Sequence, residues 1–308
     1  MPVESKRRKP IKKGFVGKNK FKKLAEMRPS SDAGQSDCSD ANALPGDVGS
    51  KLKAFALEQL NRAIAYLAQP GNARHQGIHE GRKCLRRARA TLALAGPSFK
   101  RGGEGERAAR LDFDLGQLCR GLSPLRDAQA LLEALARLSD VAPDVSAILP
   151  DAKKAAKARR DQLMQIALQR SPDFLSRLKR LAAILTRLAR LAWHATCAAD
   201  ISASVKRSMR RVERAQRKAH RHPELDEIWH TYRRRLRRLR QQDSLLAVVE
   251  PELRPVIADL EQQTELLGES QDDALLLKHC GKRSPFAPIQ RKILRTIANA
   301  RLRHIRGR

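Results

Sequence analysis

From residue 51 onward, apolar residues recur along the chain with the spacing of an α-helix. Leu, Ala and Arg dominate this region, and it lacks runs that alternate between apolar and polar residues, as strands would. Clusters of Gly, Pro and polar residues interrupt the pattern, for example at residues 69–71, 96–97, 101–105, 150–151 and 251–255. These breaks leave about ten helices of ordinary length. The pattern predicts an all-α protein built from helical hairpins and bundles.

Residues 1–50 have a different pattern from the rest of the chain. Lys and Arg dominate up to residue 28, and residues 29–50 are rich in Ser, Asp and Gly without any cation. Neither piece holds enough apolar side chains to form a core, so we expect a disordered basic tail followed by a linker. Such a tail could simply solubilise the chain, or it could add a second arm for a polyanion. The helical domain would then span residues 51–308.

The helical region contains an internal repeat. IHEGRKCLRRARA (residues 78–90) and WHTYRRRLRRLRQ (residues 229–241) share a histidine, followed by cations three, four, seven, eight and ten positions later. Further along, residues 122–132 align with residues 267–277 and match one aspartate with another.

Such duplication indicates two similar halves, about residues 51–170 and 171–308. We expect the halves to pack about a pseudo-twofold axis.

The charge balance indicates the class of partner. The sequence contains 63 Lys and Arg against 33 Asp and Glu, a formal net charge of +30. Self-repulsion from such an excess works against a compact fold, so we expect a polyanion: a nucleic acid, an anionic membrane or a chain of phosphates. Aromatic residues make up only 4% of the sequence, which argues against a groove where single-stranded bases stack.

Cysteine usage and hydropathy bear on the compartment. The five cysteines are scattered and form no C-x-x-C motif, which fits neither a disulfide framework nor a zinc site and favours a reducing compartment. No apolar segment follows the basic N-terminus as in a secretory signal. The most apolar window, residues 181–199, contains two arginines and is too polar to span a bilayer. We expect a soluble, cytoplasmic protein.

The repeated helices carry the candidate binding chemistry. On a helix, each histidine and its cations fall within an arc of roughly 160°, opposite the apolar residues. Like charges at this spacing oppose helix formation by roughly 0.3 kcal/mol per pair, a cost that a bound anion would offset. One such stripe would more simply be a solvated surface, but two near-identical copies favour a site for phosphate, onto which guanidinium groups fork. A further basic helix, residues 205–222, carries a third stripe. The predicted binding residues are His79, Arg82, Lys83, Arg86, Arg87, Arg89, Lys206, Arg207, Arg210, Arg214, His230, Arg233, Arg234, Arg237, Arg238 and Arg240.

The two histidines and two aspartates of the repeat suggest supporting roles. Neighbouring positive charge should keep His79 and His230 neutral when no anion is bound, so that each could donate to a phosphate or take up a proton. A packed core histidine is the alternative. We interpret Asp127 and Asp272 as partners that orient an arginine. The sequence has no Walker loop, no G-x-S-x-G motif and no clustered carboxylates for two metals, so we predict neither catalytic residues nor a cofactor nor a metal.

The tandem H-x-x-R-x-x-x-R-R-x-R helices, each followed by a segment that contains the aligned aspartate, resemble the CHAD family, the conserved histidine α-helical domain. The resemblance covers roughly residues 51–306. It implies an all-helical fold of two four-helix bundles around a basic cavity that binds inorganic polyphosphate, in some cases on polyphosphate granules. By position, the cavity residues it implies are His79, Arg82, Arg86, Arg87, His230, Arg233, Arg237 and Arg238.

The sequence therefore predicts a non-enzymatic protein that binds polyphosphate, and the resemblance implies association with polyphosphate granules. The first alternative is an RNA- or DNA-binding protein that uses the same basic surface. A phosphohydrolase is a second alternative and would need carboxylates near the cavity. Attachment to a membrane surface through the tail is a third alternative, but no apolar anchor accompanies the charge of the tail.

Overall fold

All regular elements among the described residues are helices, as the sequence predicts. The structure is a computed structural model that describes residues 48–141, 145–257, 259–281 and 284–306. Most of the predicted tail, residues 1–47, lies outside the described residues, and the first helix begins at Val48, slightly before the predicted boundary. The α-helices of the described part are α2 (Val48–Leu67), α3 (Ala73–Leu94), α4 (Gly96–Arg101), α5 (Gly105–Gly121), α6 (Ser123–Val141), α7 (Leu149–Arg170), α8 (Leu175–Ala189), α9 (Ala198–Arg221), α10 (Asp226–Val249), α11 (Leu260–His279) and α12 (Pro288–Arg306).

Glycine and proline set several helix boundaries. The turn between α2 and α3 uses Gly71 at φ +58°, a conformation that glycine adopts without steric cost. The predicted turn at residues 101–105 separates α4 from α5. By contrast, the predicted breaks at residues 96–97 and 150–151 become the first turns of α4 and α7, because proline is tolerated where the helix needs no amide donor.

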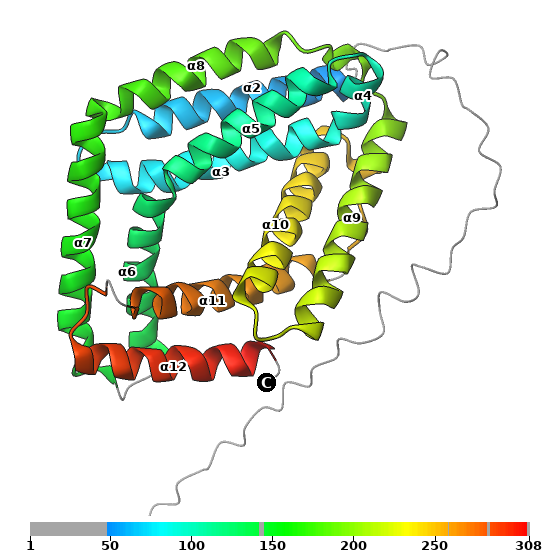
Figure 1. The fold of residues 1–308 in the computed structure, drawn as a ribbon. Helices are drawn as coiled ribbons and strands as arrows, with labels where there is room; N and C mark the ends of the chain where they lie inside the picture. Colours follow the sequence, from blue (N-terminus) through cyan, green and yellow to red (C-terminus); the bar gives the residue numbers. More distant parts are fainter. Residues whose placement is uncertain (1–47, 142–144, 258, 282–283, 307–308) are drawn as a thin grey trace, which may run out of the picture. The chain divides into compact units, whose positions relative to one another are not determined.

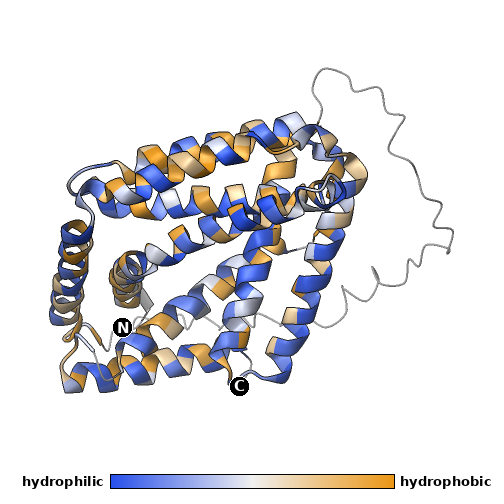
Figure 2. Ribbon diagram, turned by 45° about the horizontal axis from the view of Figure 1, so that its top comes forward, coloured by the Kyte–Doolittle hydropathy of each residue, from blue (hydrophilic) through white to orange (hydrophobic). Residues whose placement is uncertain are grey.

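The helices of the described residues are arranged as a frame in Figure 1. The pairs α2 and α3, α6 and α7, α9 and α10, and α11 and α12 pack as neighbours. In Figure 1, α7, α8, α9 and α12 lie along the edges, while α3, α6, α10 and α11 lie inside them. Figure 2 shows hydrophilic and hydrophobic residues side by side along most helices, as expected when one face of each is buried.

Buried apolar side chains form three clusters. The largest lies mainly on α2, α3, α5 and α8, and a second lies on α6, α7, α11 and α12. The third lies on α9, α10 and the start of α11. Full burial of each Leu or Ile stabilises the fold by about 1.5–3 kcal/mol before entropy is counted. The second cluster combines helices from both sides of residue 170, so the cores do not follow the order of the sequence repeat.

The helices that match in the repeat also meet in space. The repeated histidine and arginine segments lie on α3 and α10, which contact each other, and α6 contacts α11, where the two aligned aspartates lie. Such contacts are compatible with a twofold axis that passes between the matched helices, and the pseudo-symmetry of the halves stays a prediction. The first half also contains α4 and α5, whereas only a short 3₁₀ turn, η4 (Pro251–Leu253), lies between α10 and α11.

Across the described ranges, no helix combines the length and the apolar character needed to cross a membrane.

Candidate anion-binding site

The apolar faces of α3 and α10 explain how their cations are positioned. Ile78, Leu85 and Ala88 of α3 are buried, and so are Trp229 and Leu236 of α10. These residues hold one face of each helix against the cores and leave the cationic face toward the contact between α3 and α10. The apolar face of each helix is therefore buried opposite the cationic one, as the sequence predicts.

Five arginines from three helices form what we call the central arginine cluster: Arg82 and Arg86 of α3, Arg126 of α6, and Arg233 and Arg237 of α10. Burial and the neighbouring guanidinium groups lower the pKa of Arg86 to about 10. Burial also lowers the pKa of Arg237 well below its usual value, and Arg86 and Arg233 add to this effect. The cluster therefore concentrates positive charge where water screens it poorly.

The cluster lacks counter-ions for its most buried members. Neither Arg86 nor Arg237 forms an ion pair with any residue that the structure describes. The buried Nε atoms of Arg82 and Arg86, and a buried Nη1 of Arg126, have no hydrogen-bond partner. Each buried donor without an acceptor costs about 1–3 kcal/mol, and this cost is removed when an acceptor binds. An anion with several oxygen atoms would supply both acceptors for these donors and negative charge for the unpaired guanidinium groups.

Other contacts hold the cluster in place. Arg82 donates through Nη1 to the backbone carbonyl of Cys119 and, at 2.7 Å, to Oγ of Ser123. Arg126 forms a 2.8 Å ion pair with Glu133, about two helical turns further along α6. These bonds fix the guanidinium planes before any ligand arrives, which lowers the entropy lost on binding.

A second group of cations gathers around Asp112 of α5. Arg89 of α3 donates to both carboxylate oxygens of Asp112, at 2.8 and 2.9 Å. Arg238 of α10 lies 3.7 Å from the same carboxylate. Burial lowers the pKa of Arg238, and the charges of Arg89, Arg211 and Arg234 lower it further, whereas Asp112 opposes them. Asp112 thus joins α3 and α10 and partly neutralises this group.

The two histidines of the repeat have different environments. His79 is half-buried, and burial lowers its pKa to about 4, with further contributions from Arg126 and Lys83 that outweigh Glu80 and Glu133. Its imidazole is therefore neutral near pH 7, as the sequence predicts. His230 is exposed, and its Nδ1 forms a 2.7 Å hydrogen bond with Oε1 of Gln271.

Several predicted residues lie outside the central arginine cluster. Lys83 pairs with Glu80 at 2.8 Å, and the charge of Arg87 acts on Glu80 and Cys84. Arg240 forms an ion pair with Glu261 of α11, and Arg234 is exposed. The structure thus separates these cations from the cluster.

The stripe on α9 lies at the surface. All four of its predicted binding residues are exposed: Lys206, Arg207, Arg210 and Arg214.

Sequence reasoning missed Arg126 and Asp112. Arg126 directly precedes Asp127 within the aligned segment 122–132, but the second copy has Gln271 at this position, so the repeat does not mark it. Asp112 lies outside the repeat, and nothing in the local pattern marks it.

The roles of the aligned aspartates differ. Asp272 forms a 2.7 Å ion pair with Arg137 of α6, and its role of orienting an arginine stays a prediction. Asp127 instead lies 4.0 Å from Nζ of Lys278, and its charge also favours the protonated form of Arg82. Among the residues that the structure places, no group of three His, Cys, Asp or Glu side chains could hold a metal ion.

Comparisons with known proteins agree on one family. The CHAD domain model matches residues 52–280. A crystal structure of the CHAD domain from the plant Ricinus communis is similar to this chain, with a TM-score of 0.52 and 19% sequence identity. The alignment covers 87% of this chain and 94% of the plant one, and at this identity it shows the fold alone. A comparison with curated proteins finds no match. Because the family match spans most of the sequence, the chain belongs to the CHAD family.

Proposed function

We propose that this protein binds inorganic polyphosphate through the central arginine cluster and the cations around Asp112. The observation that carries the proposal is the set of partly buried guanidinium groups that meet from α3, α6 and α10, of which Arg86 and Arg237 form no ion pair with any described residue. Phosphate oxygens accept forked hydrogen bonds from arginine, so they meet both needs of the cluster: negative charge and acceptors. The CHAD family is associated with polyphosphate, which supports this choice among polyanions.

The spacing of the cations favours a chain of phosphates over a single one. Arg82, Arg86 and Arg89 follow one another along α3 at about one turn, roughly 5 Å apart along the axis. Arg233 and Arg237 repeat this spacing on α10. Two such rows provide donors for several successive phosphates, whereas one orthophosphate would satisfy few of them.

His79 couples binding to protonation in this proposal. Its imidazole is neutral in the empty site, and an incoming polyanion would offset the charge of Arg126 and Lys83. The protonated form then becomes more favourable, so the protein takes up a proton as the anion binds. Association with polyphosphate granules follows if the site holds long chains tightly.

Nucleic acid is the second candidate ligand. The exposed cations of α9 favour it, because a solvated stripe can contact the backbone of a duplex without base recognition. The partly buried position of the central arginine cluster favours the thinner, more flexible polyphosphate chain.

The test compares binding of the full chain to long-chain polyphosphate, duplex DNA and RNA at equal phosphate and physiological salt. We expect polyphosphate binding that survives an excess of nucleic acid and weakens by powers of ten as salt rises. The paired variant Arg86→Ala with Arg237→Ala should abolish that preference. A matched control, Arg170→Ala with Arg303→Ala, removes the same charge from exposed positions on α7 and α12 and should bind normally.

Two outcomes would overturn the proposal. Equal binding to the three polymers, untouched by the cluster variant, would favour a diffuse basic surface and nucleic acid. Release of free phosphate from polyphosphate with Mg²⁺ or Mn²⁺ would contradict a purely binding role and favour a phosphohydrolase.

A further inference from the structure

One face of α9 consists almost entirely of exposed cations. We call this set the α9 cationic face: Lys206, Arg207, Arg210, Arg211, Arg214, Arg217, Lys218 and Arg221. Their positions fall within an arc of about 140° around the helix axis. No carboxylate among the described residues forms an ion pair with any of them. Because α9 lies along an edge of the frame in Figure 1 and these side chains are exposed, a large partner can reach them.

The neighbouring helix α10 extends this positive charge. Arg234 and Arg235 are exposed, and Arg235 donates a 3.0 Å hydrogen bond to the backbone carbonyl of Arg211. Partial burial lowers the pKa of Arg235, and the charges of three neighbouring arginines lower it further. No carboxylate in the described ranges pairs with Arg234 or Arg235 either. Cations from two helices therefore gather on one surface without a carboxylate to balance them.

The make-up of this face favours a stiff polymer of phosphates. The apolar residues of α9, among them Val212 and Ala219, are buried on its opposite side, so the cationic face offers no apolar anchor for a bilayer. A flexible chain would lose conformational freedom on an exposed helix, where salt screens each contact. A nucleic-acid duplex is already stiff, with a persistence length of about 150 base pairs, and carries one charge per about 1.7 Å of its axis.

The dimensions of α9 match the major groove of B-form DNA. From Lys206 to Arg221 the helix is about 22 Å long, a length of duplex that holds about 13 phosphates, so each cation of the face can find a partner. Lys206 and Arg217 lie on one flank of the arc, and Arg211 and Lys218 lie on the other, about 120° away. A helix about 10–12 Å wide suits a groove about 12 Å wide, where cations on both flanks meet the two backbones. The major groove of A-form RNA is deep and narrow and excludes a helix.

The α9 cationic face is separate from the proposed polyphosphate site. None of its members belongs to the central arginine cluster or to the pair Arg89 and Arg238 beside Asp112. The two surfaces adjoin at Arg211, whose charge helps to lower the pKa of Arg238. Anions bound on the two surfaces would therefore repel each other, but they would not share a cation.

We infer that the α9 cationic face binds duplex DNA, without reading its sequence, while the central arginine cluster holds polyphosphate. One chain then joins the two polymers. Nucleic acid is thus an additional ligand on a second surface and does not replace polyphosphate in the cluster. The DNA surface stands by itself, whereas the joining of the two polymers rests on the proposed function.

The first experiment titrates the full chain into a labelled 20-base-pair DNA duplex at several salt concentrations and follows fluorescence anisotropy. Arg207→Ala with Arg210→Ala should weaken binding about 10-fold and make the slope of log K against log salt less steep by about 1.8, because two phosphate contacts are lost. Arg207→Lys with Arg210→Lys retains both charges and should bind within 3-fold of wild type. The matched control, Lys154→Ala with Lys157→Ala, removes two exposed cations at the same spacing from α7 and should bind within 2-fold.

The second experiment tests whether one chain holds both polymers. Long-chain polyphosphate is immobilised on beads, the chain is bound and washed, and the labelled duplex is added. The wild type and the α7 control should retain the duplex on the beads, and Arg207→Ala with Arg210→Ala should retain the chain but about 10-fold less duplex. Arg86→Ala with Arg237→Ala should bind free duplex within 2-fold of wild type but should not attach to the beads.

Several results would overturn the inference. Duplex binding that is unchanged in the Arg207 and Arg210 variant, or weakened equally in the α7 control, would remove the assignment to α9. Duplex RNA bound as tightly as DNA would contradict the fit to the major groove. Phosphatidylserine vesicles bound through Arg207 and Arg210 more tightly than the duplex would make a membrane the ligand.

Failure of the proposed function is distinguishable from failure of this inference. If the chain binds free duplex through Arg207 and Arg210 but does not attach to polyphosphate beads, the DNA surface is supported and the joining of two polymers is overturned. Attachment to the beads with no capture of duplex would support the central arginine cluster and overturn the DNA surface.

Discussion

The central arginine cluster and the stripe on α9 have the same pattern in the sequence but different physical settings. On α9, Val212 and Ala219 are buried while Arg207 and Arg210 are exposed, so water and salt screen the repulsion between the cations. In the cluster, Arg86 and Arg237 are partly buried and have no described counter-ion. A stripe of cations at the surface changes the free energy of unfolding little. The same stripe between helices lowers it, because the repulsion between the cations is poorly screened. The stored repulsion is what a bound anion would relieve.

The strongest test of this comparison replaces Arg86 and Arg237 with Met, which fills similar space without charge. We expect polyphosphate affinity to fall at least 100-fold, while the free energy of unfolding without ligand rises by roughly 2 kcal/mol because buried like charges are removed. Isothermal binding and denaturant titration measure the two effects. A variant that loses both affinity and stability would show that these arginines support the fold instead of the ligand.

The second test uses the pH dependence of stability. His79 has a pKa of about 4 in the folded chain and near 6.5 in an unfolded one, so between these values the unfolded chain binds more protons. The free energy of unfolding should therefore fall as the pH is lowered from about 6.5 to about 4. We expect about 2 kcal/mol from this residue, since some of the side chain stays in water.

The difference between the wild type and His79→Gln in denaturant titrations across this range isolates the effect. His230→Gln is the matched control, because His230 is exposed, and should follow the wild-type curve. Identical curves for wild type and His79→Gln would contradict a neutral, desolvated His79.

The third test removes two charges from the exposed stripe. Arg207→Ala with Arg210→Ala should lower polyphosphate affinity by only 2- to 5-fold and change the free energy of unfolding by less than about 0.5 kcal/mol. The loss should shrink at high salt, where exposed charges are screened. A loss as large as that of the central cluster would make α9 the primary binding surface.

The smallest expected effect is a gain in polyphosphate affinity, whereas the arginine variants above lose affinity. Asp112→Asn frees Arg89 and Arg238 from their shared carboxylate, so polyphosphate should bind about 2- to 3-fold more tightly. Stability should decrease by about 1 kcal/mol as the link between α3 and α10 weakens. Weaker binding in this variant would show that Asp112 positions these arginines for the ligand.

Helix periodicity and the repeat carried much of the structural prediction. They correctly indicated the all-α class and the buried faces of α3 and α10. They also selected Arg82, Arg86, Arg233 and Arg237, which the structure brings together and whose role in binding stays a prediction. Periodicity specifies which side of a helix a residue occupies, but it does not specify what lies opposite. For this reason the sequence did not separate the exposed α9 stripe from the partly buried cluster, or His230 from His79.

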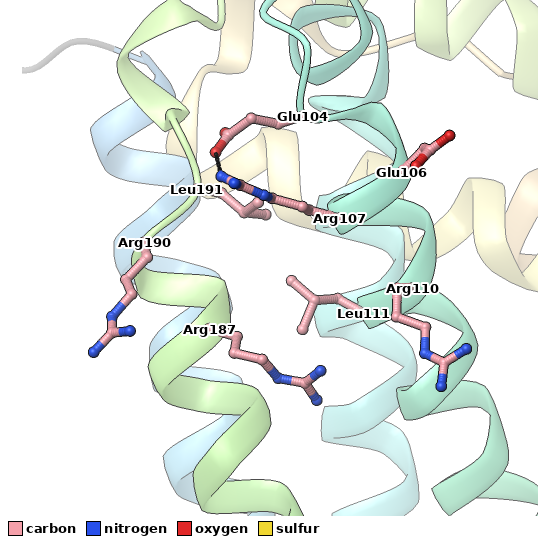
Figure 3. A pocket seen from close by; sticks show the side chains of 8 residues that line it. All are labelled: Glu104, Glu106, Arg107, Arg110, Leu111, Arg187, Arg190 and Leu191. Carbon is pink, nitrogen blue, oxygen red and sulfur yellow. Dashed lines mark hydrogen bonds and ion pairs between the residues drawn. The ribbon is translucent and has the colours of Figure 1, made fainter.

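Residues from other helices were the hardest to predict. Arg126 joins the cluster because α6 packs against α3, and Asp112 reaches two arginines because α5 lies beside α3. A pocket between α5 and α8 is lined by Glu104, and Asp114 of α5 accepts a bond from Arg187 of its lining (Figure 3). Both carboxylates look like ordinary surface residues in the sequence. Such sites arise from tertiary contacts, so a linear pattern cannot specify them.

The shared core of α6, α7, α11 and α12 has a consequence for biosynthesis. Leu131 and Leu149 from the earlier part of the chain are covered only when Leu276 and Leu294 from the later part are in place. The ribosome must therefore release nearly the whole helical region before this core can close. Until then the nascent chain carries unburied leucines beside a growing set of arginines, which makes it a natural client for chaperones during translation.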